Sequence, residues 1–289
     1  MEYLFHRGEK IPLIGFGTYR LGSLDKSEEL GTLSYGIDKY GITLIDTAEM
    51  YGSGISETIL NGIIRRYDRS RLFIVDKILP CNAEKGLYAE CCKRSLERLG
   101  TDHIDLYLLH WKGNVDLQDM ADHMEQLVRS GMIRHWGVSN FDTHEMEELF
   151  ACDNGPKCFC DQILYNLADR GAEYDLIPWC NEHDVLTMAY SPLCNSYDPR
   201  VAVTSAEAVK RIAHKEQKTP ESLMLSFVIR DRRTVTVFKT SSIPHLNNNM
   251  KNVFEPVGAD DITELEKRYP PPTEKYPITA PYTGRSRSL

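Results

Sequence analysis

The chain has 289 residues, of which 42% are hydrophobic and 26% charged, and its formal net charge is −8. This composition is typical of a folded globular protein with a large core, and the acidic balance argues against nucleic acid as a partner, because phosphate binding needs a basic patch. The first ten residues are charged and no apolar run approaches the roughly 18 residues of a membrane span, so we expect a cytoplasmic protein with no membrane partner.

Short apolar runs rich in strand-forming residues alternate with amphipathic segments along the chain. They predict eight strands, over residues 13–17, 42–46, 72–77, 104–110, 136–139, 160–164, 185–190 and 234–238. Capping-box spacing at 142–145 and 204–207, and Thr219 followed by Pro220, predict helix starts between the strands. Eight repeats of strand and helix predict one α/β domain over residues 1–289, a (β/α)8 or TIM barrel.

The last connection of the barrel is longer than the others. It spans residues 191–233 and carries two helical patterns, which predicts an extra helix before the eighth strand. Further helices are expected over 243–253 and 261–268. Residues 269–289 are rich in proline and lack periodicity, so we expect an extended C-terminal tail.

The eight cysteines are expected to be reduced thiols, because a chain of this length without a secretory signal gives no reason for disulfides. Cys152, Cys158 and Cys160 lie close together in the sequence but match no zinc-binding spacing. No metal site is predicted.

Four titratable side chains follow three successive strands. Asp46 ends the second strand and Tyr51 follows it, while Lys77 and His110 end the third and fourth strands. Taken singly, each has a structural explanation, as a cap, a core aromatic, a solvated strand end or an interior histidine. Because parallel strands of a barrel end on one face, all four are expected to converge, which favours a proton-transfer site.

The chemistry of these side chains suggests a role for each. A tyrosine has a pKa near 10 and releases its proton poorly unless a cation favours the phenolate, and Lys77 is such a cation. Asp46 would orient Lys77, and His110 would donate to a carbonyl oxygen or relay a proton. Reduction of a carbonyl also needs a hydride, which no side chain supplies, so a nicotinamide or flavin cofactor is implied.

The chain resembles the aldo-keto reductases along nearly its whole length. The matching segments are Gly15–Thr18, Asp46–Ala48 with Tyr51–Gly52, Lys77, Leu108–Trp111, Gly137–Phe141, Gln162 and Ala189–Leu193. The chain is most similar to the bacterial, short-looped members that reduce small aldehydes such as methylglyoxal. The resemblance implies a barrel that reduces aldehydes or ketones with NADPH, with Tyr51 as general acid, Lys77 lowering its pKa, Asp46 paired to Lys77, and His110 orienting the carbonyl.

The resemblance also implies a set of cofactor contacts. Ser139, Asn140 and Gln162 are expected to hold the nicotinamide carboxamide, and Tyr190 to stack on its ring. The other expected contacts are Gly17, Thr18, Tyr19, Asp46, Ser191 and Leu193, and, at the adenosine end, Lys239, Thr240, Ser241, His245 and Asn249. Because His245 replaces a common arginine and cannot bind a phosphate in bidentate fashion, the preference for NADPH over NADH is expected to be weaker than in the full pattern.

The substrate is expected to be a small carbonyl compound. Its predicted contacts are Tyr19, Tyr51, His110 and Trp111, with Met50 and Tyr165 as further candidates. Asp161 and Asp76 depart from the asparagine and threonine common in the family, with little effect expected on the chemistry. Two other functions stay open: a cofactor-binding regulatory subunit with negligible turnover, and an enzyme that runs in the oxidising direction. We expect a monomer or a weak homo-oligomer.

Overall fold

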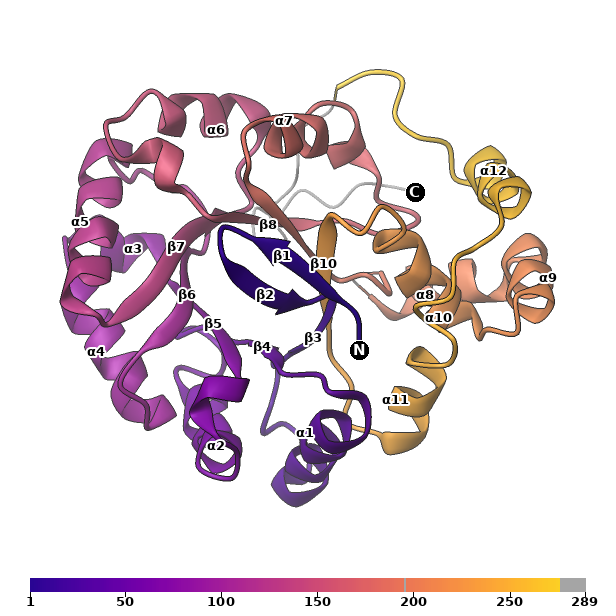
Figure 1. Cartoon of the computed structure of the whole chain (residues 1–289), viewed down its shortest axis with the longest axis horizontal. Helices are drawn as coiled ribbons and strands as arrows, with labels where there is room; N and C mark the ends of the chain where they lie inside the picture. Colours follow the sequence, from indigo (N-terminus) through magenta and orange to yellow (C-terminus); the bar gives the residue numbers. More distant parts are fainter. Residues whose placement is uncertain (195, 276–289) are drawn as a thin grey trace.

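The structure is a computed structural model that describes residues 1–194 and 196–275. Eight parallel strands form a closed barrel inside a ring of helices (Figure 1), in the order β10-β3-β4-β5-β6-β7-β8-β9. The strands are β3 (Ile14–Gly17), β4 (Leu44–Asp46), β5 (Phe73–Ile78), β6 (Ile104–Leu109), β7 (Ile133–Ser139), β8 (Cys160–Leu164), β9 (Leu186–Tyr190) and β10 (Thr234–Phe238). The predicted TIM barrel and its eight strands are confirmed.

The helices follow the strands in the expected alternation. They are α1 (Lys26–Tyr40), α2 (Ile55–Ile64), α3 (Pro80–Ala83), α4 (Tyr88–Leu99), α5 (Leu117–Ser130), α6 (Thr143–Phe150), α7 (Leu176–Glu182), α8 (Tyr197–Ser205), α9 (Glu207–Lys215), α10 (Pro220–Val228), α11 (Ile243–Asn249) and α12 (Ala259–Arg268). The extra helical segment expected before the last strand is present and is divided into α8 and α9 at Ala206, whose backbone is extended.

Two of the three predicted helix starts are confirmed. Asp142 and Glu145 form a reciprocal capping box at α6, and the Thr219 side chain accepts a hydrogen bond from the Ser222 amide at α10. The capping box predicted at 204–207 is wrong. Thr204 lies in the last turn of α8 and donates to the Arg200 carbonyl oxygen at 2.9 Å, because the chain is still helical there.

A β-hairpin that the sequence analysis did not predict lies across the N-terminal end of the barrel. It consists of β1 (Tyr3–His6) and β2 (Glu9–Pro12) and is drawn in indigo at the centre of Figure 1. Arg7 and Gly8 form its two-residue turn, with φ angles of 43° and 84°. Such a turn favours Asn-Gly or Asp-Gly, so Arg-Gly is a weak signal for it.

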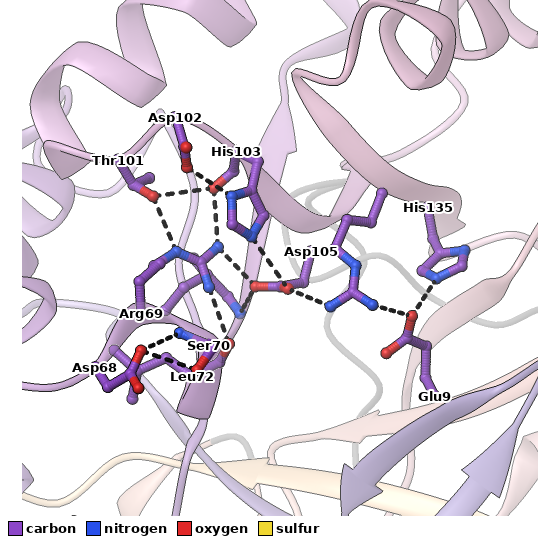
Figure 2. Close-up of polar contacts among 12 residues, drawn as sticks. Glu9, Asp68, Arg69, Ser70, Leu72, Thr101, Asp102, His103, Asp105 and His135 are labelled. Atoms are coloured by element: carbon purple, nitrogen blue, oxygen red, sulfur yellow. Dashed lines mark hydrogen bonds and ion pairs between the residues drawn. The ribbon is translucent and has the colours of Figure 1, made fainter.

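Ion pairs attach this hairpin to the barrel. Glu9 accepts hydrogen bonds from Arg134 and, at 3.0 Å, from His135. Arg134 also reaches the buried Asp105, which accepts a further bond from Arg69 at 2.7 Å (Figure 2). This network closes the N-terminal end of the barrel and leaves the C-terminal ends of the strands as its open face.

The described part of the tail lies on that open face. Arg170 donates to the Tyr269 carbonyl oxygen at 2.7 Å, and Lys275 pairs with Asp142 and Asp175 at the starts of α6 and α7. The rest of the expected tail, residues 276–289, lies outside the described residues. No helix of the described chain has both the length and the apolar character needed to cross a membrane. All eight cysteines are free thiols.

Asp161, the second residue of β8, carries a buried carboxyl group. Its side chain has no exposure, and neither oxygen accepts a well-formed hydrogen bond from any described residue. Burial raises the pKa of the Asp161 carboxyl well above its ordinary value of 3.8, against a smaller opposing effect of the Phe141 amide. Strand alternation places Asp161 on the opposite side of β8 from Gln162, so its burial affects stability rather than the open face.

Replacing Asp161 by asparagine is therefore expected to stabilise the protein by about 1–3 kcal/mol at pH 8. The unfolded carboxyl ionises above its ordinary pKa of 3.8 while the folded one stays protonated, so this one group destabilises the wild type more as the pH rises, and the gain in Asp161→Asn grows. Urea unfolding at pH 5 and pH 8 measures this gain. The control is Asp153→Asn, which alters an exposed carboxylate. A gain that is equal at both pH values would contradict the assignment.

Candidate active site

Four side chains from neighbouring strands meet at the open face of the barrel. Asp46 is the last residue of β4, Lys77 lies in β5, His110 follows β6, and Tyr51 lies in the turn between β4 and α2. The Lys77 ammonium donates to Asp46 Oδ1 at 2.6 Å and lies 3.5 Å from the Tyr51 hydroxyl. The rings of Tyr51 and His110 meet edge to face, with their centroids 5.9 Å apart.

The loop after β4 sets the position of Tyr51. The Tyr51 amide donates to the Ala48 carbonyl oxygen at 2.9 Å, and Gly52, Ser53 and Gly54 then adopt positive φ angles before α2 begins. Three successive residues in this region turn the chain sharply, and glycine supplies two of them without steric cost. The phenol is thus held over the end of β5.

Lys77 is a fully buried amine, and its partners account for all three of its donors. They are Asp46, the Thr47 carbonyl oxygen at 2.7 Å and the Tyr51 hydroxyl. Asp46 also accepts a hydrogen bond from Gln162 Nε2 at 2.8 Å, which ties the pair to β8 across the barrel. Because both side chains are buried, the pair is shielded from bulk water.

His110 is buried and electrically neutral at pH 7. Burial, and then the positive charge of Lys77, hold the pKa of the His110 imidazole well below 6.5. Its Nδ1 atom is buried and has no hydrogen-bond partner among the described residues. A neutral imidazole can donate or accept one hydrogen bond but carries no charge of its own, so His110 is suited to orienting a carbonyl oxygen.

A cavity of about 650 Å³ opens above these residues. Of the residues predicted for the site, those that line it are Gly17, Tyr19, Asp46, Tyr51, His110, Ser139, Asn140, Gln162, Tyr190, Ser191, Leu193 and Lys239. Lys77 lies beneath it, in contact with Asp46 and Tyr51.

One wall of the cavity is a hydrogen-bonded group of polar side chains from β7, β8 and β9. Ser139 donates to the Gln162 carbonyl oxygen at 2.7 Å, and the Tyr190 hydroxyl donates to Asn140 Oδ1 at 2.7 Å. The strands come close because Gly137 lies where a Cβ would stand 2.3 Å from the Cys160 carbonyl oxygen. This wall offers amide groups and an aromatic ring to a planar ligand.

Other predicted residues lie outside the described lining. Thr18 is buried and donates to the Asp46 carbonyl oxygen at 3.0 Å, so it fixes the end of β4. The remainder are Met50, Trp111, Tyr165, Thr240, Ser241, His245 and Asn249. Tyr165 bonds to Glu173 and Arg230. His245 is exposed on α11, and the Trp111 ring lies beside that of His110 at 5.2 Å.

Two cationic residues of the lining were not predicted. Arg20 lies over the Tyr19 ring, 5.3 Å from its centroid, and Arg200 lies over the ring of Tyr197 on α8. The sequence signal for Arg20 was its place beside Tyr19, whereas the capping-box pattern at 204–207 gave no indication that a helix begins at Tyr197 and includes Arg200.

The charges of the lining fit a phosphorylated cofactor. Arg20, Arg200 and Lys239 are cations, while Asp46, the one acidic side chain in the described lining, is paired with Lys77. In a protein of net charge −8, such a cleft concentrates anionic ligands. The amide wall and this cationic region are the parts that a nicotinamide dinucleotide needs.

Comparisons with known proteins agree with this geometry. The model of the aldo/keto reductase family matches residues 13–269. The methylglyoxal reductase YeaE of Escherichia coli is 36% identical over 267 residues, which cover 92% of this chain and 93% of the relative. The crystal structure of an aldo-keto reductase from Klebsiella pneumoniae in complex with NADPH has a TM-score of 0.91 and 37% identity, over 96% of this chain and 99% of that one. A structure of an aldo/keto reductase from the same organism with NADP and acetate has a TM-score of 0.90 and 38% identity, over 95% and 97% of the two chains.

The buried pair of Lys77 and Asp46 leads to a prediction about stability. Lys77→Met should lower the free energy of unfolding by about 3–5 kcal/mol, because it leaves the Asp46 carboxylate buried without its cation. The double variant Asp46→Asn/Lys77→Met should recover part of this loss. Urea unfolding measures both, with Lys85→Met, on the surface, as the control. A double variant less stable than Lys77→Met would show that the two side chains are not coupled in this way.

Proposed function

The chain belongs to the aldo/keto reductase family and is an oxidoreductase that reduces aldehydes or ketones with NADPH, and we propose that Tyr51 donates the proton in this reaction. The observation that carries the proposal is the contact of 3.5 Å between the Tyr51 hydroxyl and the fully buried Lys77 ammonium. The comparisons give no support to the regulatory subunit that the sequence left open.

The cofactor supplies the hydride when it is bound. Ser139, Asn140 and Gln162 would hold its carboxamide, and Tyr190 would pack against its ring and leave one face open to the substrate. Lys239 would meet the 2′-phosphate, with Thr240, Ser241, His245 and Asn249 along the adenosine. Arg20 and Arg200 suit the diphosphate, because guanidinium groups bind phosphate oxygens in bidentate fashion. Gly17, Thr18, Ser191 and Leu193 would complete the cofactor site.

The four residues at the base of the cavity divide the proton chemistry between them. Tyr51 gives its hydroxyl proton to the carbonyl oxygen, and the Lys77 ammonium stabilises the phenolate that remains. Asp46 keeps the ammonium charged and in place, and Gln162 restrains Asp46. His110, being neutral, donates a hydrogen bond to the same carbonyl oxygen and orients it toward Tyr51.

The substrate is proposed to be a small aldehyde of the methylglyoxal type. The name of the Escherichia coli relative supports this class, as do the aromatic rings of Tyr19 and Tyr51, whose centroids lie 5.4 Å apart. Trp111 would join them at the mouth. The same residues serve the oxidising direction by microscopic reversibility, and the ratio of kcat/KM values in the two directions tells which is favoured.

The proposal also includes the compartment of the enzyme, its oligomeric state and its partners. Free thiols throughout the chain suit the reducing cytoplasm. The absence of a nucleic-acid partner stays a prediction from the acidic composition, and a monomeric or weakly oligomeric state stays a prediction as well.

Tyr51→Phe should lower kcat for methylglyoxal reduction by a factor of about 10²–10⁴, the usual contribution of a general acid. The Kd for NADPH should change less than about twofold, because the ring and its packing are retained. Steady-state NADPH oxidation and fluorescence titration measure the two quantities.

Tyr174→Phe is the control for this experiment, since Tyr174 is 47% exposed and outside the cavity. Full activity in Tyr51→Phe would refute the proton donor. Failure of the wild-type protein to oxidise NADPH with any aldehyde or ketone would refute the reaction itself.

The pH dependence tests the neutral state of His110. Because its folded pKa lies well below 6.5, kcat/KM should show no break at pH 6.5. The contribution of His110 to stability, taken as the difference between the wild type and His110→Gln, should instead fall as the pH drops through 6.5, because the unfolded imidazole binds a proton there and the folded one does not. Rate profiles and urea unfolding between pH 5 and 8 measure both effects. A break near 6.5 that disappears in His110→Gln would show that the imidazole titrates in the folded enzyme.

A further inference from the structure

Lys239 is a second lysine at the cavity that is paired with a buried acid. It follows β10 and lines the cavity, and its ammonium lies 3.1 Å from Oε1 of Glu29 in the first turn of α1. The Lys239 side chain is 29% exposed, whereas that of Glu29 has no exposure. The carboxylate therefore faces the ammonium from inside the protein, and the ligand would approach it from the cavity.

Glu29 differs from an ordinary acidic residue at a helix start. Acidic side chains in a first turn interact favourably with the helix dipole from the surface, as the exposed Glu28 does. Glu29 points inward instead, and its Oε2 accepts a hydrogen bond from the Gly22 amide at 2.6 Å. It thus joins α1 to the loop after β3 and, through Lys239, to the loop after β10.

The burial of Glu29 keeps Lys239 bound to it. A buried carboxylate that loses its cation is costly, so Lys239 does not leave Glu29 when an anion arrives. An ammonium has three donors and can serve an anion and Glu29 together. Its charge, however, is already balanced by the carboxylate, so an incoming phosphate meets a pair with no net charge.

We infer that Glu29 is a specificity-determining residue that weakens the binding of the cofactor 2′-phosphate and so limits the preference for NADPH over NADH. This inference rests on the proposed role of Lys239. A phosphate monoester carries a charge of about −1.5 to −2 at pH 7, and a carboxylate on the far side of the ammonium repels it. NADH lacks this phosphate, so Glu29 should leave its affinity nearly unchanged.

The test is the Kd for NADH divided by the Kd for NADPH, measured by calorimetric titration without substrate. A larger ratio means a stronger preference for NADPH. Contacts to the diphosphate, which both cofactors share, cancel in this ratio. Glu29→Gln removes the charge at nearly constant volume, and the ratio should rise about fivefold or more because the ammonium is no longer balanced. Glu28→Gln changes the net charge equally on the same helix turn and should leave the ratio unchanged.

A second variant at the same position keeps the test decisive if Glu29→Gln does not fold. Glu29→Asp keeps the charge but withdraws it from Lys239, and it should raise the ratio in the same direction by a smaller factor. Thermal unfolding of each variant establishes that it is folded.

The variant Lys239→Gln tests the proposed role of Lys239 separately from the inference about Glu29. It should lower the ratio, and adding Glu29→Gln to it should produce no further change, because Glu29 acts through Lys239. An unchanged or lower ratio in both Glu29 variants, while Lys239→Gln lowers it, would overturn the inference alone. An unchanged ratio in Lys239→Gln would overturn the role of Lys239 and the inference with it.

Discussion

The burial of the Lys77 ammonium is the constraint on which the rest of the site depends. A charge with no contact to water must find its hydrogen-bond acceptors inside the protein. Lys77 finds them in Asp46, the Thr47 carbonyl oxygen and the Tyr51 hydroxyl, all on β4 or in the loop after it. The interaction that makes burial of the lysine tolerable also holds β4 beside β5 and brings the phenol to the end of the barrel. Stability and chemistry are therefore coupled at this point.

The same ammonium has opposite effects on its two titratable neighbours. It stabilises a negative charge on Tyr51 but opposes a positive charge on His110, whose pKa is already lowered by burial. In the proposed mechanism, one cation would thereby favour proton release from the phenol and keep the imidazole neutral. Tyr51 and His110 both line the cavity, and in the proposed mechanism this difference would allow one to transfer a proton while the other donates a hydrogen bond.

The sequence predicted the parts of the structure that depend on local patterns. Parallel strands buried on both faces appear as apolar runs, so the bounds of β8 and β10 match the expectation, and polar residues at strand ends converge because the barrel requires it. It did not predict contacts between distant segments. Glu29 and Lys239 are 210 positions apart in the chain, and Arg200 reaches the cavity only because α8 packs over it. The capping box at 204–207 failed for a related reason, since the sequence pattern does not show that α8 already occupies its first residues.

Two lysines at strand ends, each paired with a buried acid, flank the cavity, and their different exposure suits them to different tasks. Lys77 and Asp46 are 0% and 4% exposed, so neither salt nor a diffusing anion reaches them, and their field acts only on the adjacent phenol. Lys239 is 29% exposed over an acid with no exposure, so one side of its ammonium meets solvent and ligand. Added salt screens the second pair and not the first. If Lys239 meets the cofactor and Lys77 acts on Tyr51 as proposed, the same kind of pair would control cofactor affinity and proton transfer, and only the affinity would respond to the ionic strength.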